Sequence, residues 1–197
     1  FEAPDAAGQI TRRAKDQRIV GLRPMIADIP DPNWILGDAI TPALEAMLVN
    51  GLVFDAHARP DLVSVMTLLA ERYPDLQIAL NHGGKPPIES RELSEWRRDI
   101  STLARQKNVA CKLSGLLTEA GPYSGDAAIG EVVEHLAECF GPSRLLWGSD
   151  WPVLNMAGSY SGWVSQSERL IGQHLPGHAS AIGAGNAERI YLHRTGV

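Results

Sequence analysis

Short apolar runs alternate with longer amphipathic stretches along the chain. Five of the short runs are rich in aliphatic residues and are bounded by Gly, Pro or Asp, as buried strands are. They begin at positions 20, 52, 77, 109 and 144, which is the spacing of repeated strand–helix units. The predicted strands are Val20–Ile26, Leu52–Ala58, Gln77–Asn81, Val109–Leu113 and Arg144–Gly148. Strands joined by helices of this length run parallel, so a parallel sheet is expected.

The amphipathic stretches carry the start and stop signals of helices. Thr41-Pro42 begins the first predicted helix and Gly51 follows its last turn, while Pro74 ends the second. Apolar residues recur at helical spacing in each stretch. After the helix that begins at Thr41, the predicted helices are Asp61–Tyr73, Glu92–Gln106, Asp126–Phe140, Gly162–Leu175 and a closing helix around Ala179–Tyr191.

This alternation indicates an α/β fold of the TIM (β/α)8 barrel type. Such a barrel needs eight strand–helix units, whereas the 197 residues supply five. We therefore expect one domain over residues 1–197, a barrel that is incomplete at its N-terminal side. An open, doubly wound sheet of five parallel strands is the structural alternative, although no G-x-G-x-x-G loop follows a strand.

Composition narrows the function classes. The net charge of −5 at pH 7 argues against a nucleic-acid-binding protein, which would present a basic face. No apolar run approaches the ~20 residues of a membrane span, and the first residues lack the pattern of a signal peptide. Cys111 and Cys139 have no metal-binding spacing and are expected to be reduced thiols. A cytoplasmic protein is the expectation.

Polar residues stand where each predicted strand ends. In parallel α/β folds these carboxyl ends carry the functional side chains. The candidates are Arg23, His57, Arg59, His82, Lys112 and Asp150. Two histidines and an aspartate that converge at one rim would suit a divalent metal such as zinc.

Each candidate also has a structural interpretation. His82 precedes two glycines, which let a ligand approach closely, and this favours function over a packed imidazole. Asp150 could cap a turn, but its place directly after a strand favours a base or a metal ligand. His57 is equally consistent with a ligand and a packed ring. It alternates with Asp55 and Arg59, so these three side chains are expected on one strand face.

The remaining candidates are charged residues at strand ends and tryptophans in rim loops. Lys112 lies inside an apolar strand and needs a bound anion or hydroxyl group, because an unpaired buried charge is costly. Arg23 is either a substrate contact or a structural bridge. Trp34 and Trp151 lie in rim loops and could wall a pocket. The other histidines are expected to be surface or helix-packing residues: His135, His174, His178 and His193.

Five motifs in order resemble the amidohydrolase superfamily. They are Gly21–Trp34, Asn81–Ile88, Cys111–Leu116, Trp147–Val153 and Gly185–Tyr191. The similar branch contains TIM-barrel lactone hydrolases such as L-fuconolactonase, L-rhamnonolactonase and 2-pyrone-4,6-dicarboxylate lactonase. The motifs are individually short, but together they run over essentially the whole chain.

The resemblance implies a role for each strand end. His82 matches the histidine of the family's sixth strand and Asp150 the aspartate of its eighth. Arg23 and Lys112 match residues after the fourth strand and on the seventh. His57 falls at the end of the fifth, where some members have a metal-binding histidine.

One family feature is missing. The family carries a His-x-His pair at the end of its first strand, and no His-x-His occurs here. Phe1 resembles a position at the end of the third strand, so strands 1–3 are expected to be lacking. The resemblance implies one divalent metal ion, zinc in the first place, with a metal-independent mechanism as the alternative.

The expected reaction is hydrolysis of a sugar-acid lactone or a related carboxylate. Asp150 would act as the general base on water, with His82 or a metal polarising the carbonyl oxygen. Arg23, Arg59, Lys112, Trp34 and Trp151 would bind the substrate. The alternatives are decarboxylation or amide hydrolysis on the same barrel, or a catalytically inactive fragment. Exposed parallel sheet edges favour association, so a homo-oligomer is expected.

Overall fold

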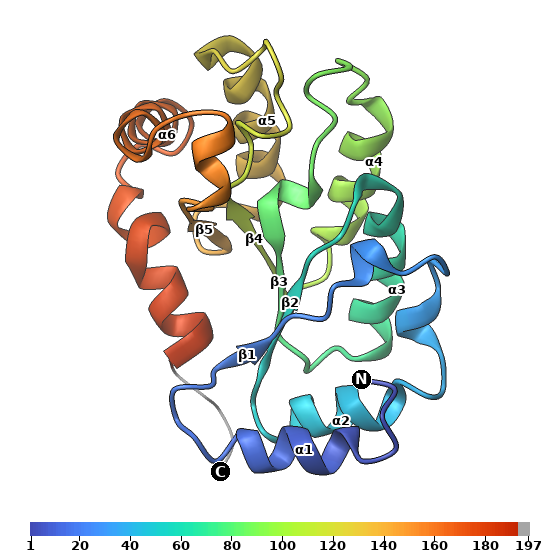
Figure 1. Cartoon of the computed structure of the whole chain (residues 1–197). Coiled ribbons are helices and arrows are strands. Elements are labelled where there is room, and N and C mark those ends of the chain that lie inside the picture. The colour runs from blue at the N-terminus through green and yellow to red at the C-terminus, as the bar shows by residue number, and fades with distance from the viewer. Residues whose placement is uncertain (193–197) are drawn as a thin grey trace.

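Five parallel strands form one sheet in the computed structural model, which describes residues 1–192 (Figure 1). The strands pair in their order along the chain, β1-β2-β3-β4-β5. Strand order reverses in a doubly wound sheet, so this sequential order rules out the open-sheet alternative and is that of a barrel wall. The strands are β1 (Gly21–Leu22), β2 (Val53–Ala56), β3 (Ile78–Leu80), β4 (Val109–Leu113) and β5 (Leu145–Trp147).

Helices connect the strands, and the predicted α/β alternation is confirmed. The helices are α1 (Ala6–Arg13), α2 (Thr41–Val49), α3 (Val63–Arg72), α4 (Ser94–Leu103), α5 (Asp126–Phe140) and α6 (Tyr160–His174). The helix α1 was not predicted. The closing helix is present as two π-helical segments, Ala181–Gly185 and Glu188–Leu192.

The first predicted strand is much shorter than expected. The sequence predicted Val20–Ile26, but β1 covers only Gly21–Leu22. Pro24 has no backbone N–H and cannot continue the ladder, and a short 3₁₀ turn begins at Ile26. The chain therefore leaves the sheet early and forms an irregular rim segment from Arg23 onward.

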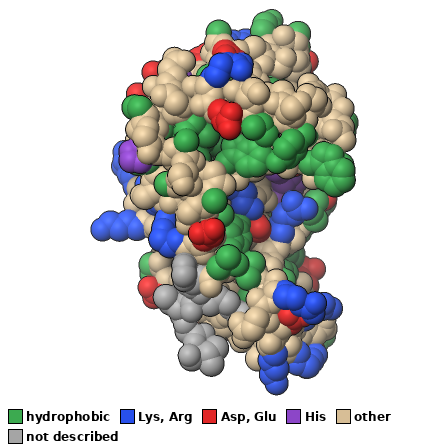
Figure 2. All heavy atoms as spheres, turned by 90° about the vertical axis from the view of Figure 1, so that its left-hand side faces the viewer, with side chains coloured by type: hydrophobic (Ala, Val, Ile, Leu, Met, Phe, Trp, Pro, Cys, Tyr) green, Lys and Arg blue, Asp and Glu red, His purple; other side chains and the backbone are tan. Residues whose placement is uncertain are grey.

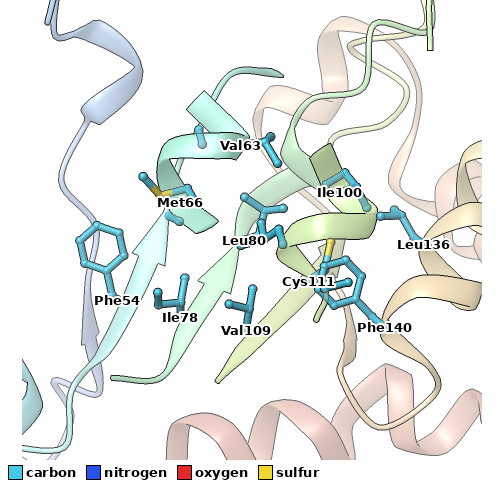
Figure 3. Close-up of a cluster of buried hydrophobic side chains, with 14 of the residues drawn as sticks. Phe54, Val63, Met66, Ile78, Leu80, Ile100, Val109, Cys111, Leu136 and Phe140 are labelled. Carbon is cyan, nitrogen blue, oxygen red and sulfur yellow. The ribbon is translucent and has the colours of Figure 1, made fainter. Parts of the chain in front are cut away.

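The helix-facing side of the sheet carries the main core. Phe54, Ile78, Leu80, Val109 and Cys111 point from the strands toward side chains of α3, α4 and α5 (Figure 3). All five are fully buried. Alternation along the strands sends the neighbouring residues to the opposite face, as the period of two requires.

The opposite face is covered by the C-terminal segments. Val53, Ala79, Ala110 and Leu146 pack there against Ile190 in a second, small apolar cluster. In Figure 1 these C-terminal segments lie to the left of the sheet, whereas α3 and α4 lie to its right. The small alanine side chains leave room for the helical segment to approach the strands.

The Asn186 side chain links the C-terminal segment to the loop before β5 and to the first residue of β5. Its Nδ2 donates to the carbonyl oxygens of Pro142 at 2.7 Å and Leu145 at 2.8 Å, and the residue is buried. Both carbonyls would lose this donor if the Asn186 amide were removed.

We expect Asn186→Ala to lower the free energy of unfolding by about 1–3 kcal/mol, the cost of leaving buried polar groups without a partner. Asn155→Ala is the matched control, because Asn155 is exposed. Urea denaturation of the two variants measures the difference. Equal unfolding free energies would show that the Asn186 contacts do not hold the segment.

Candidate active site

A run of left-handed residues follows β3. His82, Gly83, Gly84 and Lys85 have φ angles of 55°, 60°, 70° and 53°. The two glycines adopt this conformation without a Cβ penalty, whereas His82 and Lys85 hold it at a cost of about 1–3 kcal/mol each. The Trp96 indole donates to the Gly83 carbonyl at 2.8 Å and stabilises the turn. Strained backbone of this kind clusters at functional sites.

The turn directs the His82 ring toward two partners from other strand ends. Its Nδ1 lies 2.9 Å from the Ser114 hydroxyl after β4. Its Nε2 lies 3.7 Å from Oδ1 of Asp150 after β5. In the tautomer where Nδ1 accepts from Ser114, the proton is on Nε2 and faces the Asp150 carboxylate.

His82 is an uncharged imidazole at neutral pH. Burial is the largest cause and lowers its pKa from 6.5 to about 4, with further contributions from the charges of His57, Lys85, Lys112 and Arg23. Its side chain is 14% exposed, which leaves one edge accessible. A neutral ring of this kind can donate or accept a hydrogen bond but does not add a charge to the site.

Asp150 is the carboxylate that faces His82. It also has a left-handed backbone, with φ of 58°, and precedes the cis peptide bond Trp151–Pro152. Burial raises its pKa, Lys85 and Arg23 oppose this shift, and Glu119 adds to it. A carboxylate with a raised pKa is a stronger base than an exposed one, which suits proton transfer.

His57 completes a cluster of two imidazoles and one carboxylate. Its ring meets the His82 ring edge-on at a centroid distance of 5.7 Å. Burial, followed by the charges of Lys85 and Arg23, lowers its pKa. Its Nδ1 is buried and has no hydrogen-bond partner within residues 1–192. A buried polar atom without a partner is uncommon and is consistent with a ligand-binding position.

Two ion pairs bring further charges to the cluster. Lys85 Nζ lies 2.7 Å from Glu119 Oε1, and both side chains are about three-quarters buried. Lys112 Nζ lies 2.5 Å from Asp55 Oδ1 on the face of the sheet opposite the main core. The Tyr191 hydroxyl donates to the same Asp55 oxygen at 3.1 Å. Burial raises the pKa of Tyr191, so this hydroxyl stays protonated.

The arrangement does not form a metal site by itself. The donor types of His57, His82 and Asp150 suit zinc. However, within the described part of the chain no three His, Cys, Asp or Glu side chains are grouped closely enough to hold a metal ion. The charges of Lys85 and Arg23 also act on all three groups and disfavour an added cation.

The rim around the cluster is apolar on one side. Trp151 is 64% exposed, and Val153, Met156 and Tyr160 on the segment after it are also exposed. Figure 2 shows a histidine recessed between basic side chains, beneath a patch of hydrophobic side chains. Arg23 is exposed at the rim, and its charge reaches the three cluster residues. Arg23 and Trp151 are thus placed where a bound ligand could touch them.

Arg59 and Trp34 are placed away from this cluster by other contacts. Arg59 forms an ion pair with Asp61 at 3.1 Å and donates to the Ala27 carbonyl. The strand β2 ends at Ala56 and a proline turn begins at Pro60, so the predicted alternation of Asp55, His57 and Arg59 does not continue to Arg59.

The Trp34 indole donates to Glu2 at 2.5 Å, and its ring packs near Phe1. Of the histidines expected to pack on helices, His135 donates Nε2 to the Arg97 carbonyl of α4 at 3.1 Å. His193 lies outside the described residues. Neither cysteine forms a disulfide, as expected.

Sequence reasoning missed three contributors. Ser114 directly follows the end of β4 and lies within the Cys111–Leu116 motif, a position that could have indicated it. Lys85 follows the double glycine directly, and its charge next to His82 was a visible signal. Glu119 lies in a loop without a recognisable pattern, so no sequence signal was available for it.

A family model described as Amidohydrolase matches residues 2–192. The chain belongs to the amidohydrolase family. This confirms the resemblance inferred from the five motifs and the assignment to a family of hydrolases. No helix among residues 1–192 is both long and apolar enough to cross a membrane.

Two lactonases are among the similar proteins. The chain is 39% identical to an L-fucono-1,5-lactonase of Burkholderia ambifaria, over 97% of this chain and 67% of that protein. It is 31% identical to an L-fucono-1,5-lactonase of Burkholderia multivorans, over 94% of this chain and 68% of that protein. The chain therefore spans about two thirds of the length of these relatives.

A solved structure of similar fold contains zinc. The amidohydrolase of Burkholderia multivorans with bound zinc superposes with a TM-score of 0.88 at 29% identity, over 96% of this chain and 70% of that one. The predicted TIM-barrel family is thus confirmed by both sequence and fold.

Gly115 provides the space for the His82 ring, and its substitution tests this geometry. A Cβ at Gly115 would lie 2.6 Å from His82 Nδ1 and 2.8 Å from Cγ, at a φ of 63°. Gly177 is the matched control, with a φ of 82° and open space around a Cβ. We expect Gly115→Ala to be more destabilising than Gly177→Ala by about 1–3 kcal/mol, the range of overpacking. Denaturant midpoints measure it, and equal losses would refute the proposed packing.

Proposed function

We propose that this protein hydrolyses the lactone of a sugar acid, with Asp150 as the general base. The observation that carries the proposal is the facing of Asp150 Oδ1 and His82 Nε2 at 3.7 Å. Because the two atoms face each other, a water held by Asp150 and a carbonyl oxygen held by His82 would lie side by side. The two L-fucono-1,5-lactonases that the chain resembles support a lactone as the substrate.

In the first step, Asp150 removes a proton from a water molecule. The water oxygen forms a bond to the lactone carbonyl carbon, and the carbonyl oxygen takes the electron pair. His82, protonated on Nε2 because Nδ1 accepts from Ser114, donates to that oxygen as its negative charge develops. The positive charge of Arg23 acts on the same region and lowers the energy of the anion.

In the second step, the tetrahedral intermediate collapses. The bond between the carbonyl carbon and the ring oxygen breaks, and Asp150 returns its proton to the departing oxygen. The product is an open-chain hydroxy acid, which loses a proton to solvent. The raised pKa of Asp150 suits this reversal, because the group must accept and then donate a proton near neutral pH.

The predicted binding residues divide into two groups under this proposal. Arg23 and Trp151 line the rim and contact the substrate. Lys112 forms an ion pair with Asp55, which also accepts a hydrogen bond from Tyr191. The positive charge of Lys112 therefore lies on the face of the sheet opposite the main core. Arg59 and Trp34 keep the structural partners described above. Zinc binding remains a prediction. Among residues 1–192, no three His, Cys, Asp or Glu side chains lie close enough together to hold a metal ion, and the proposed reaction includes no step on zinc.

Replacement of Asp150 tests the role of the base. We expect Asp150→Asn to reduce kcat/KM for L-fucono-1,5-lactone by at least about 100-fold, because general base catalysis contributes about 10²–10⁴ in rate. Asp75→Asn is the matched control at an exposed turn. Initial rates, with thermal melting to confirm folding, provide the measurement. Near-normal turnover of Asp150→Asn would exclude the mechanism.

The pH dependence follows from the direction of the Asp150 shift. The active form is the carboxylate, so kcat/KM falls as the pH drops through the Asp150 pKa. Because burial raises this pKa, the acidic limb is expected above the ordinary aspartate value of 3.8. A profile of kcat/KM, which reports the free enzyme, locates the limb. A limb at or below 3.8 contradicts a buried Asp150 base.

A further inference from the structure

The Lys85–Glu119 ion pair joins the loop that carries His82 to the loop that carries Ser114. The Lys85 backbone N–H donates to the His82 carbonyl at 2.8 Å, which fixes Lys85 directly beside His82. Glu119 lies five residues after Ser114, the partner of His82 Nδ1. The 2.7 Å contact between Nζ and Oε1 therefore spans the loops after β3 and β4.

Both loops hold the pair in a defined place. The Thr118 hydroxyl donates to the Gly115 carbonyl at 2.8 Å, and the Glu119 carbonyl accepts from the Glu89 N–H at 3.0 Å. Leu116, Leu117 and Ala120 are buried around Glu119. The backbone on each side is anchored, so the ion pair does not depend on flexible surface side chains.

A structural role alone explains the pair poorly. Burial of two charges costs desolvation free energy that their attraction must offset, so a largely buried ion pair is weak evidence for a stabilising role. Lys85 also adopts a left-handed backbone, a conformation that costs free energy. Lys85 lies in the same turn as His82, and the side chains of Lys85 and Glu119 are 28% and 23% exposed, so a ligand bound beside His82 can reach the pair.

The chemistry of the pair favours uncharged, hydroxyl-rich ligands. The ammonium keeps N–H donors beyond the one directed to Glu119, and the carboxylate keeps acceptor positions. Neighbouring hydroxyl groups of a sugar ring can accept from one and donate to the other. A substrate carboxylate would meet the negative charge of Glu119 and would have to displace it from Lys85.

We infer that Lys85 and Glu119 form the specificity-determining pair of this site, which selects uncharged polyhydroxylated lactones and rejects lactones that carry carboxylates. This inference rests on the proposed lactone hydrolysis. It adds a binding role for two residues that the reaction itself does not require. Like charges placed opposite each other are a general means of rejecting a wrong ligand.

The test compares two lactones and removes one charge at a time. L-fucono-1,5-lactone is the uncharged substrate and 2-pyrone-4,6-dicarboxylate is the dianionic one. Glu119→Gln keeps the shape of the side chain but frees the Lys85 charge. We expect it to raise the ratio of kcat/KM for the dianion over that for the sugar lactone by about tenfold or more.

Glu89→Gln is the matched control, because it removes the same charge from the neighbouring exposed loop and leaves the pair intact. It is expected to leave the ratio within about twofold of the original, as rim charges beyond a direct pair are screened. Lys85→Met is the second variant and is expected to lower the ratio, since the unpaired Glu119 then repels the dianion. Equal ratios for Glu119→Gln and Glu89→Gln overturn the inference.

Binding separates this result from a failure of the proposed reaction. Calorimetry with L-fucitol and with pyridine-2,4-dicarboxylate measures the same selectivity without turnover. If the protein cleaves neither lactone, the proposed function fails, and a shift of binding preference toward the dicarboxylate in Glu119→Gln still supports the pair. If binding preference is unchanged in Glu119→Gln, the pair does not determine specificity, whatever the turnover.

Discussion

The parallel register of the sheet is the constraint on which the site depends. Ala56 pairs with Leu80, Leu80 with Cys111 and Cys111 with Leu145, so four strands are aligned at one level. Each chain segment then leaves the sheet at the same edge. The residues that follow come from four separate segments of the chain, and the strand pairing brings these segments to one edge of the sheet. Strand pairing thus determines where the candidate site lies, whichever side chains stand at the strand ends.

The left-handed turns determine what the strand ends present. An extended chain would continue to alternate its side chains, and His82 would not reach both Ser114 and Asp150. The turn at residues 82–85 redirects the ring, and Gly115 leaves the space that the ring occupies. The conformational cost of His82, Lys85 and Asp150 is offset by the packed core beneath them. The strained backbone conformations are therefore found at residues of the candidate site.

Sequence patterns predicted the parts of the structure that local periodicity controls. The strand Val109–Leu113 was predicted with the bounds of β4, proline and glycine signals located α2 and the end of α3, and apolar spacing located α5. Contacts made by loop residues could not be predicted from local sequence patterns. Arg59 left its predicted face because Pro60 starts a turn. Glu119 reached Lys85, and Tyr191 reached Asp55, across long sequence separations that no local pattern encodes.

Charge balance explains how a buried aspartate can act as a base here. Unpaired cations beside Asp150 would stabilise its carboxylate and weaken it as a proton acceptor. Glu119 offsets Lys85, so part of this positive field is cancelled. Burial then remains the largest influence and raises the Asp150 pKa. The same ion pair occupies the Lys85 ammonium, so a carboxylated substrate would have to compete with Glu119 for it, whereas Arg23 stays exposed at the rim. The strength of the base and the selection exerted by Lys85 and Glu119 therefore have one physical origin.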